Sequence, residues 1–99
     1  MLQITKNKDN QSLVLALEGR LDTATAPELE KELGNLTSEV TALTFDLAKL
    51  EYISSAGLRV LLSARKRMVD RGTMTVTNVN ETVMEIFEVT GFSDILTIA

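Results

Sequence analysis

Residues 46–62 read DLAKLEYISSAGLRVLL, and this stretch decides how the chain folds. Its first half is apolar and strand-like. From Ser55 or Ala56 onward, its apolar residues have the spacing of an amphipathic helix. Two serines, Ser54 and Ser55, stand at the junction, and serine is a preferred N-cap because it accepts a hydrogen bond from a backbone N–H group. The stretch therefore predicts a strand that runs almost directly into a helix.

The serines at this junction have a structural and a functional interpretation. As an N-cap, a serine stabilises the helix by about 1 kcal/mol and needs no other role. A phosphate on such a serine would also be stabilised, because unpaired N–H groups and the positive end of the helix dipole favour an anion. Gly57 follows, and it either leaves room for a kinase or is simply a small residue between helix and sheet. The residues alone leave both interpretations open.

The segments before this stretch predict two strands and a helix. Apolar and polar side chains alternate over residues 2–4 and 12–18, as they do in half-buried strands, and Gly19 is expected to end the second strand. Thr25 and Glu28 have the spacing of a capping box, which marks the start of a helix. We expect the two strands to pair as a hairpin.

The segments after Ser54 continue the alternation of helix and strand. Together with a strand at 42–47, the predicted elements are a helix that begins near Ser55 or Ala56 and is stopped by Gly72, a strand at 73–77, a helix capped by Asn80 and ended by Gly91, and a short strand at 95–98. The buried stripe of the helix after Ser54 would comprise Leu58, Leu61, Leu62, Met68 and Val69. The order ββαβαβα with a final β predicts one α/β domain over residues 1–99, with a mixed sheet of four to five strands covered by helices.

The composition excludes several classes of function. The 99 residues include no cysteine and no histidine, which removes disulfides, thiol catalysis, and the commonest general base and metal ligand. The net charge of −4 argues against nucleic-acid binding, and no apolar run is long enough to span a membrane. The N-terminus does not resemble an export signal. We therefore expect a cytoplasmic protein with no catalytic residues, no cofactor, no metal site, no nucleic-acid partner and no segment inserted in a membrane.

Half of the ten cationic residues fall in the helix predicted after Ser54. They are Arg59, Arg65, Lys66, Arg67 and Arg71. Such a run is usually a solvated face, and the alternative is a patch that attracts an acidic partner. Arg59 lies one turn from Ser55, which makes it the best placed of the five for direct contact with a partner that reaches this serine.

The stretch at 46–62 resembles the signature of STAS domains, specifically that of the bacterial anti-sigma factor antagonists. Further matching segments are GRLD at 19–22, the Arg71-Gly72 turn and FEVTGF at 87–92. The resemblance covers essentially the whole chain, with its elements in the same order. It implies a STAS-type fold and a protein-binding role in transcription regulation rather than an enzyme.

The resemblance also implies a site and a mechanism. In that family, an anti-sigma factor that is itself a serine kinase phosphorylates a serine in this loop. The unphosphorylated antagonist binds the kinase and releases the sigma factor, and a PPM-type phosphatase restores this form. The match of SAGL at 55–58 makes Ser55 the acceptor, but Ser54 replaces the Asp of well-known members and is a rival acceptor. The implied partner-binding residues are Asp22, Thr23, Ser54, Ser55, Ala56, Gly57 and Arg59.

Two aspartates have structural interpretations beside any role in binding. Asp22 matches an acidic residue of the family and lies in a loop expected beside the acceptor. It either belongs to the kinase-facing surface, repelled by the new phosphate, or shapes a turn or caps a helix. We expect Asp46 to lie at a strand end and to form hydrogen bonds with the following loop.

Two other functions compete with a phosphorylated antagonist. Small STAS proteins are also non-phosphorylated subunits of lipid-transport ATPases, and STAS domains regulate anion transporters, so a transporter subunit is the alternative. A serine hydrolase is disfavoured because the chain has no G-x-S-x-G elbow and no histidine to act as the base. No phosphate-binding loop or dinucleotide fingerprint supports nucleotide binding.

Overall fold

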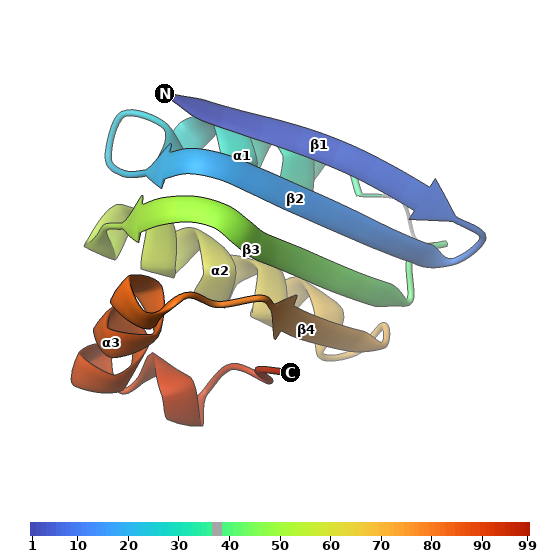
Figure 1. Ribbon diagram of the computed structural model, residues 1–99. Helices are drawn as coiled ribbons and strands as arrows, with labels where there is room; N and C mark the ends of the chain where they lie inside the picture. Colours follow the sequence, from blue (N-terminus) through green and yellow to red (C-terminus); the bar gives the residue numbers. More distant parts are fainter. Residues whose placement is uncertain (37–38) are drawn as a thin grey trace.

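A computed structural model describes residues 1–36 and 39–99, and this part of the chain forms an α/β fold (Figure 1). Its elements in order are β1 (Leu2–Asp9), β2 (Ser12–Leu21), α1 (Ala26–Gly34), β3 (Ala42–Ile53), α2 (Ser55–Met68), β4 (Thr73–Thr77), α3 (Glu81–Thr90) and the 3₁₀ helix η1 (Phe92–Asp94). The predicted fold class and the order of its main elements are confirmed.

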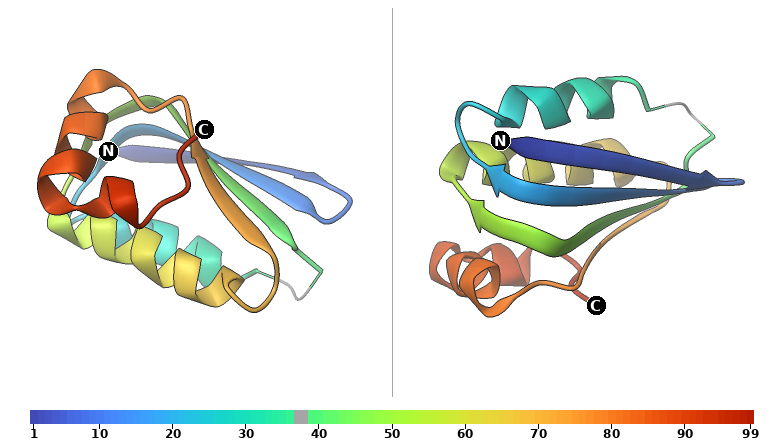
Figure 2. Two further views of the ribbon diagram at one scale, coloured as in Figure 1. Left: turned by 90° about the horizontal axis from the view of Figure 1, so that it is seen from below. Right: turned by 45° about the horizontal axis from the view of Figure 1, so that its top comes forward.

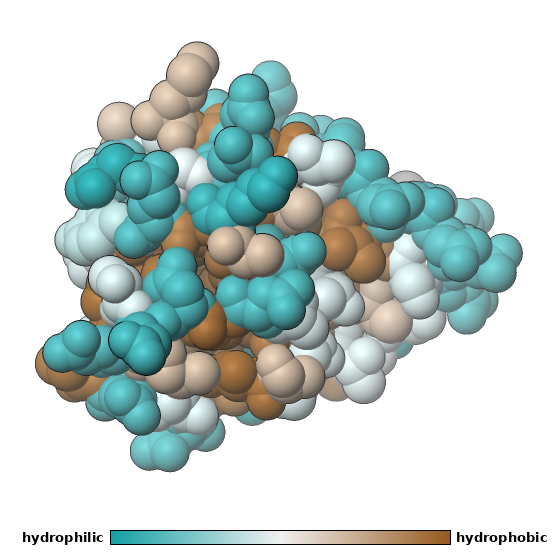
Figure 3. All heavy atoms as spheres, viewed as in Figure 1, coloured by the Kyte–Doolittle hydropathy of each residue, from teal (hydrophilic) through white to brown (hydrophobic). Residues whose placement is uncertain are grey.

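The four strands form one mixed sheet in the order β1-β2-β3-β4. The hairpin makes β1 antiparallel to β2, whereas the crossovers through α1 and α2 make β2, β3 and β4 parallel. Figure 2 shows α1 and α2 on one face of this sheet and α3 beside the end of β3 that extends past β4. The opposite face mixes hydrophilic and hydrophobic side chains (Figure 3). Helix α2 begins at the edge of the sheet where the parallel strand β3 ends.

The core lies between the sheet and the helices α1 and α2. Alternate residues of β2 and β3 point into it and are almost fully buried: Leu13, Leu15, Leu17, Leu43, Phe45 and Leu47. Each such side chain contributes about 1.5–3 kcal/mol through its transfer from water. The alternation in the sequence predicted this face correctly. The junction between β3 and α2 thus rests on a closely packed layer of apolar side chains.

Gly19 lies inside β2, so the prediction that it ends the strand is wrong. The pairing of β2 with β3 shifts register after Gly19 and continues to Leu21. Gly19 has φ +105°, and a Cβ there would collide with the carbonyl oxygen of Met1. Glycine is required because the irregular strand and the N-terminus of β1 approach each other closely. This extension carries β2 to the loop beside α2.

Three smaller predictions are also wrong. Thr25 precedes α1, but its side chain makes no capping hydrogen bond there. Val69 follows the last residue of α2 and is 64% exposed rather than buried. The expected last strand is η1 followed by a single bridge between Val76 and Ile98, because the backbone from Phe92 onward closes into tight turns. Helix α3 follows the prediction, with Asn80 as its N-cap and Gly91 in the left-handed conformation at its end.

Candidate functional site

The site is built around the junction where β3 passes into α2 through a single residue, Ser54. The Ser54 backbone is extended, and its hydroxyl accepts a 3.4 Å hydrogen bond from the Gly57 N–H group. The Ser54 N–H group donates to the Leu21 carbonyl oxygen at 2.8 Å, and its own carbonyl oxygen accepts from Leu58 at 2.9 Å. Ser54 is therefore the N-cap of α2, held by backbone bonds on both sides.

Ser55 is the first residue of α2, and its side chain is exposed. Within residues 1–36 and 39–99, its hydroxyl has no hydrogen-bond partner. The N-cap and the first helical residue differ in direction, so one serine points back to its own helix while the next faces solvent. The Ser55 hydroxyl can be reached by another protein.

Gly57 is buried on the inner side of the first turn of α2. A Cβ at this position would lie 2.7 Å from Leu21 Cγ, 2.8 Å from Ile53 Cγ1 and 2.9 Å from the Leu21 carbonyl oxygen. The missing side chain makes room for Leu21 inside the protein rather than for a visiting kinase. Gly57 thereby lets the loop between β2 and α1 pack directly beside the start of α2.

Asp22 shapes that loop. One of its carboxylate oxygens accepts hydrogen bonds of 3.1 Å from the N–H groups of Ala24 and Thr25 and from the Thr25 hydroxyl. The backbone bond from Thr25 is the largest cause of a lowered Asp22 pKa, and the Thr25 hydroxyl and the Ala24 N–H group lower it further. Thr25 also donates its hydroxyl to the Arg20 carbonyl oxygen at 2.8 Å. Asp22 thus stabilises this turn, as its structural interpretation predicted.

Several candidate residues from distant parts of the sequence meet in one hollow. It measures about 270 Å³ between the starts of α1 and α2, and its lining residues are Thr23, Ala26, Pro27, Glu30, Ala56, Arg59 and Val60. Thr23, Ala56 and Arg59 were predicted to belong to one surface. Arg59 forms no ion pair with any described residue, so its charge is available at the rim.

Arg20 and Tyr52 form a contact that sequence reasoning missed. They are neighbours across β2 and β3, and the Arg20 guanidinium carbon lies 4.6 Å from the centre of the Tyr52 ring. Arg20 Nε also lies 3.9 Å from an Asp22 carboxylate oxygen. The contact joins the ends of the two strands that carry the site loops. Only the shifted register of β2 pairs these residues, and no local sequence signal reports that shift.

Asp46 belongs to a different part of the molecule. It lies within β3 rather than at the strand end, and it is the last β3 residue paired with β4. One carboxylate oxygen accepts 3.0 Å hydrogen bonds from the Asn78 side-chain amide and the Ala48 N–H group. These bonds, that of Asn78 first, lower the Asp46 pKa. Asp46 therefore has a structural role, as predicted, but the loop that it binds follows β4 rather than its own strand.

Acidic side chains do not gather into a metal-binding group of three or more anywhere in residues 1–36 and 39–99. In the same residues, every helix is too short or too polar to cross a membrane. The arrangement offers the exposed Ser55 hydroxyl, the Arg59 cation one turn away and a shallow hollow that Arg59 lines. These features suit a contact with another protein.

Known sequences match this chain over almost its full length. The family model described as "STAS domain" matches residues 2–99. BtrV of Bordetella bronchiseptica, whose name assigns it to the anti-sigma factor antagonists, is 34% identical over 99% of this chain and 86% of its own length. The anti-sigma-B factor antagonist of Listeria monocytogenes is 30% identical over 94% of this chain and 83% of its own length.

Solved structures have the same fold. An anti-sigma factor antagonist from Mycobacterium paratuberculosis superposes with a TM-score of 0.89 at 21% identity, over 99% of this chain and 85% of that one. The phosphorylated form of SpoIIAA from Bacillus superposes with a TM-score of 0.76 at 17% identity, over 98% of this chain and 91% of that one. From the match to its family model and from these relatives, the chain belongs to the STAS domain family.

Proposed function

We propose that this chain is an anti-sigma factor antagonist controlled by phosphorylation of Ser55. In its unphosphorylated form it binds an anti-sigma factor that is a serine kinase, and the sigma factor is released. Phosphorylation by that kinase ends the binding, and a PPM-type phosphatase removes the phosphate and restores the binding form. These reactions take place in the cytoplasm. The observation that carries the proposal is the exposed Ser55 hydroxyl beside a neighbouring serine that is already engaged. The names of the relatives support the same role.

The two serines differ in their availability to a kinase. The Ser54 oxygen accepts the capping hydrogen bond from Gly57, and its side chain is half-buried. Phosphorylation of Ser54 would have to displace this cap. Ser55 has no such bond, and a phosphate on it would lie near the positive end of the helix dipole. These differences support Ser55 as the acceptor.

The partner-binding surface extends from Ser55 over the hollow between α1 and α2. Thr23 and Ala56 line that hollow and Arg59 stands at its rim, while Asp22 holds the adjoining loop in shape. A phosphate on Ser55 adds about 1.5 to 2 negative charges at pH 7. An unpaired charge in a buried interface costs about 3–5 kcal/mol, which corresponds to at least a hundredfold loss of affinity. The switch requires no refolding of the chain.

The test is phosphorylation of the purified chain by its cognate kinase with ATP, followed by location of the phosphate by mass spectrometry. We expect the phosphate on Ser55 in the natural chain and in Ser54→Ala. We expect Ser55→Ala to bind the kinase constitutively and Ser55→Asp to bind it weakly, as measured by calorimetry. A phosphate on Ser54, or equal affinities of Ser55→Ala and Ser55→Asp, would contradict the proposal. Binding to a membrane ATPase with no response to kinase would favour the transporter subunit instead.

A further inference from the structure

The exposed surfaces of α2 and α3 carry charges of opposite sign. Helix α2 (Ser55–Met68) contains four basic residues and no acidic one. Helix α3 (Glu81–Thr90) contains three acidic residues and no basic one, and no basic residue follows Arg71 in the sequence. Each helix also has one large apolar side chain in solvent at or just beyond its C-terminal end: Val89 in α3 is 82% exposed, and Val69 after α2 is 64% exposed. Single exposed apolar side chains are common on protein surfaces, so the opposite charges of the two helices carry more weight here than Val69 and Val89.

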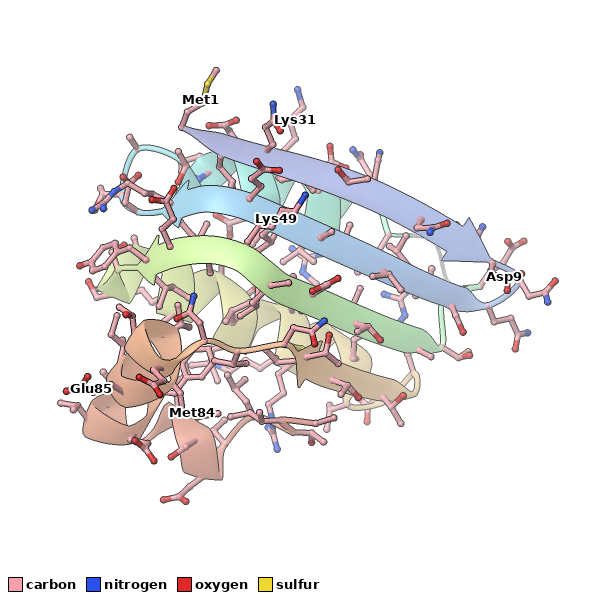
Figure 4. All side chains as sticks on the ribbon, in the orientation of Figure 1. Met1, Asp9, Lys31, Lys49, Met84 and Glu85 are labelled. Carbon is pink, nitrogen blue, oxygen red and sulfur yellow. The ribbon has the colours of Figure 1, made fainter. Side chains whose placement is uncertain are left out.

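The acidic face is the outer side of α3. Thr82, Glu85, Ile86, Val89 and Thr90 line a shallow groove of about 300 Å³ along it. Figure 4 shows Glu85 pointing from α3 away from the body of the molecule. In the part of the chain that the structure describes, neither Glu85 nor the neighbouring Glu88 forms an ion pair. The acidic face therefore combines an apolar centre with uncompensated negative charge.

The basic hollow lies at the other end of α2 from Ser55. It measures about 370 Å³, and its lining residues are Arg65, Met68, Val69, Gly72, Thr73, Met74, Thr75, Leu96 and Thr97. Its wall is apolar where Val69 borders it, and Arg65 supplies positive charge without an ion pair to any described residue. No carboxylate lines it. Arg65 in the basic hollow and Glu85 on the acidic face are thus opposite in charge, and each surface also includes an exposed valine.

We propose that the acidic face of one copy of this chain binds the basic hollow of a second copy, with Val89 seated against Val69. The two surfaces belong to different elements, α3 and the C-terminal end of α2, and no ion pair joins them within the chain among its described residues. A contact between two different surfaces is heterologous, so copies add head to tail. Charge complementarity supports a second copy as the occupant, because the chain itself supplies both halves.

The basic hollow lies far from the Ser55 switch. Val69 lies fourteen residues after Ser55, and at about 1.5 Å per helical residue the basic hollow is roughly 20 Å from the acceptor serine. A second copy bound at the basic hollow therefore leaves the Ser55 hydroxyl exposed. The two proposals are tested by different measurements, kinase phosphorylation and self-association, so a failure of one says nothing about the other.

Sedimentation equilibrium of the purified chain, at concentrations up to about 1 mM, tests the contact. We expect the average mass of the natural chain to rise with concentration beyond that of a dimer. Val89→Lys disables the acidic face and Arg65→Glu disables the basic hollow, and each variant alone should associate at least about tenfold more weakly. Lys31→Glu changes the charge as much as Arg65→Glu but lies on α1, outside both surfaces, and should associate like the natural chain.

The decisive measurement is an equimolar mixture of Val89→Lys and Arg65→Glu. Each variant keeps the surface that the other has lost, so the mixture should form a heterodimer and nothing larger. Circular dichroism melts of both variants check that they are folded. A natural chain that stays monomeric up to about 1 mM, or a mixture that stays monomeric while the natural chain associates, would overturn the proposal.

Discussion

Ser54 and Ser55 are chemically identical and adjacent, yet the start of α2 gives them different roles. The Ser54 hydroxyl accepts a hydrogen bond from Gly57, and its backbone is bonded to Leu21. The Ser55 hydroxyl faces solvent. A chain that needs both a stable helix start and a modifiable group can divide these tasks between two serines, because phosphorylation of the exposed one leaves the cap in place.

Substitution of each serine by alanine should separate the two roles. Ser54→Ala should lower the free energy of unfolding by about 1 kcal/mol, because it leaves the Gly57 N–H group without its capping partner. Ser55→Ala should change it by less than about 0.5 kcal/mol, since an exposed hydroxyl without a partner is removed. Ser54→Asp keeps a capping oxygen and is the matched control. Urea unfolding followed by circular dichroism measures all three, and a larger loss for Ser55→Ala would contradict the assignment.

The carboxyl groups of Asp22 and Asp46 should both titrate below their ordinary pKa of 3.8, because each carboxylate accepts hydrogen bonds in the folded state. Their stabilising effect is therefore complete above pH 3.8 and is lost as the pH falls through the lower folded-state pKa values. NMR titration of the side-chain carboxyl carbons measures both groups.

The variant Asn78→Gly tests the cause of the lowered Asp46 pKa. Asn78 has φ +57°, a conformation that glycine adopts freely, so the variant removes the donor without backbone strain. The Asp46 pKa should rise toward its ordinary value, because the Asn78 amide is the largest cause of its shift. The Asp22 pKa is the internal control, since its donors are Ala24 and Thr25. An unchanged Asp46 pKa would show that another group holds it down.

At the scale of elements, the site depends on the close packing of the loop after β2 against the first turn of α2. Leu21 fills the space beside Gly57, and the Leu21 carbonyl oxygen accepts the bond from Ser54. Asp22 and Thr23 follow directly, so the position of Leu21 fixes where they lie relative to Ser55. One glycine thereby brings two loops, about thirty residues apart in sequence, to the same surface.

Gly57→Ala should disturb this packing and lower the free energy of unfolding by about 1–3 kcal/mol, because its Cβ would press on Leu21 and Ile53. Gly34→Ala is the matched control: Gly34 ends α1, and a Cβ there meets nothing within 4 Å. Its free energy of unfolding should stay the same or rise by up to about 1 kcal/mol. Equal losses in the two variants, measured by urea unfolding, would contradict the packing argument.

Elements set by local chemistry could be predicted from the sequence. The alternation around Phe45 predicted the buried face of β3. Asn80 and Gly91 predicted the limits of α3, because an N-cap and a left-handed glycine act on the helix turn beside them. The mixed sheet followed from the order of the elements. The residues predicted near Ser55 came from a contiguous pattern, and their role in binding stays a prediction.

Features set by contacts between distant strands could not be predicted. Gly19 is a common strand terminator, and its role inside β2 depends on the approach of Met1. Thr25 has the spacing of a capping residue, but its hydroxyl is used by the backbone of Arg20 and Asp22. The contact between Arg20 and Tyr52 exists only in the shifted register of β2 and β3. In each case the deciding partner lies outside the local sequence window.

At the scale of the whole molecule, Ser55 stands at the edge of a rigid body rather than inside it. The strand that precedes it, β3, has a neighbour on each side in the sheet. The last apolar side chains of β3, Leu50 and Ile53, are almost fully buried. A phosphate added to Ser55 therefore meets solvent and the start of α2, not the core. The proposed switch would act by changing a surface while the fold stays constant.

Phosphorylation of Ser55 should consequently leave the stability of the chain unchanged or raise it by up to about 1 kcal/mol, because the new negative charge lies at the positive end of the α2 dipole. Over the same reaction, the affinity for the kinase should fall at least about a hundredfold. Urea unfolding and amide NMR spectra of both forms measure the first effect, and calorimetry measures the second. If the phosphorylated chain is instead destabilised, with NMR shifts spread through β2 and β3, then the switch acts by loosening the fold, and a charge in the interface is not its cause.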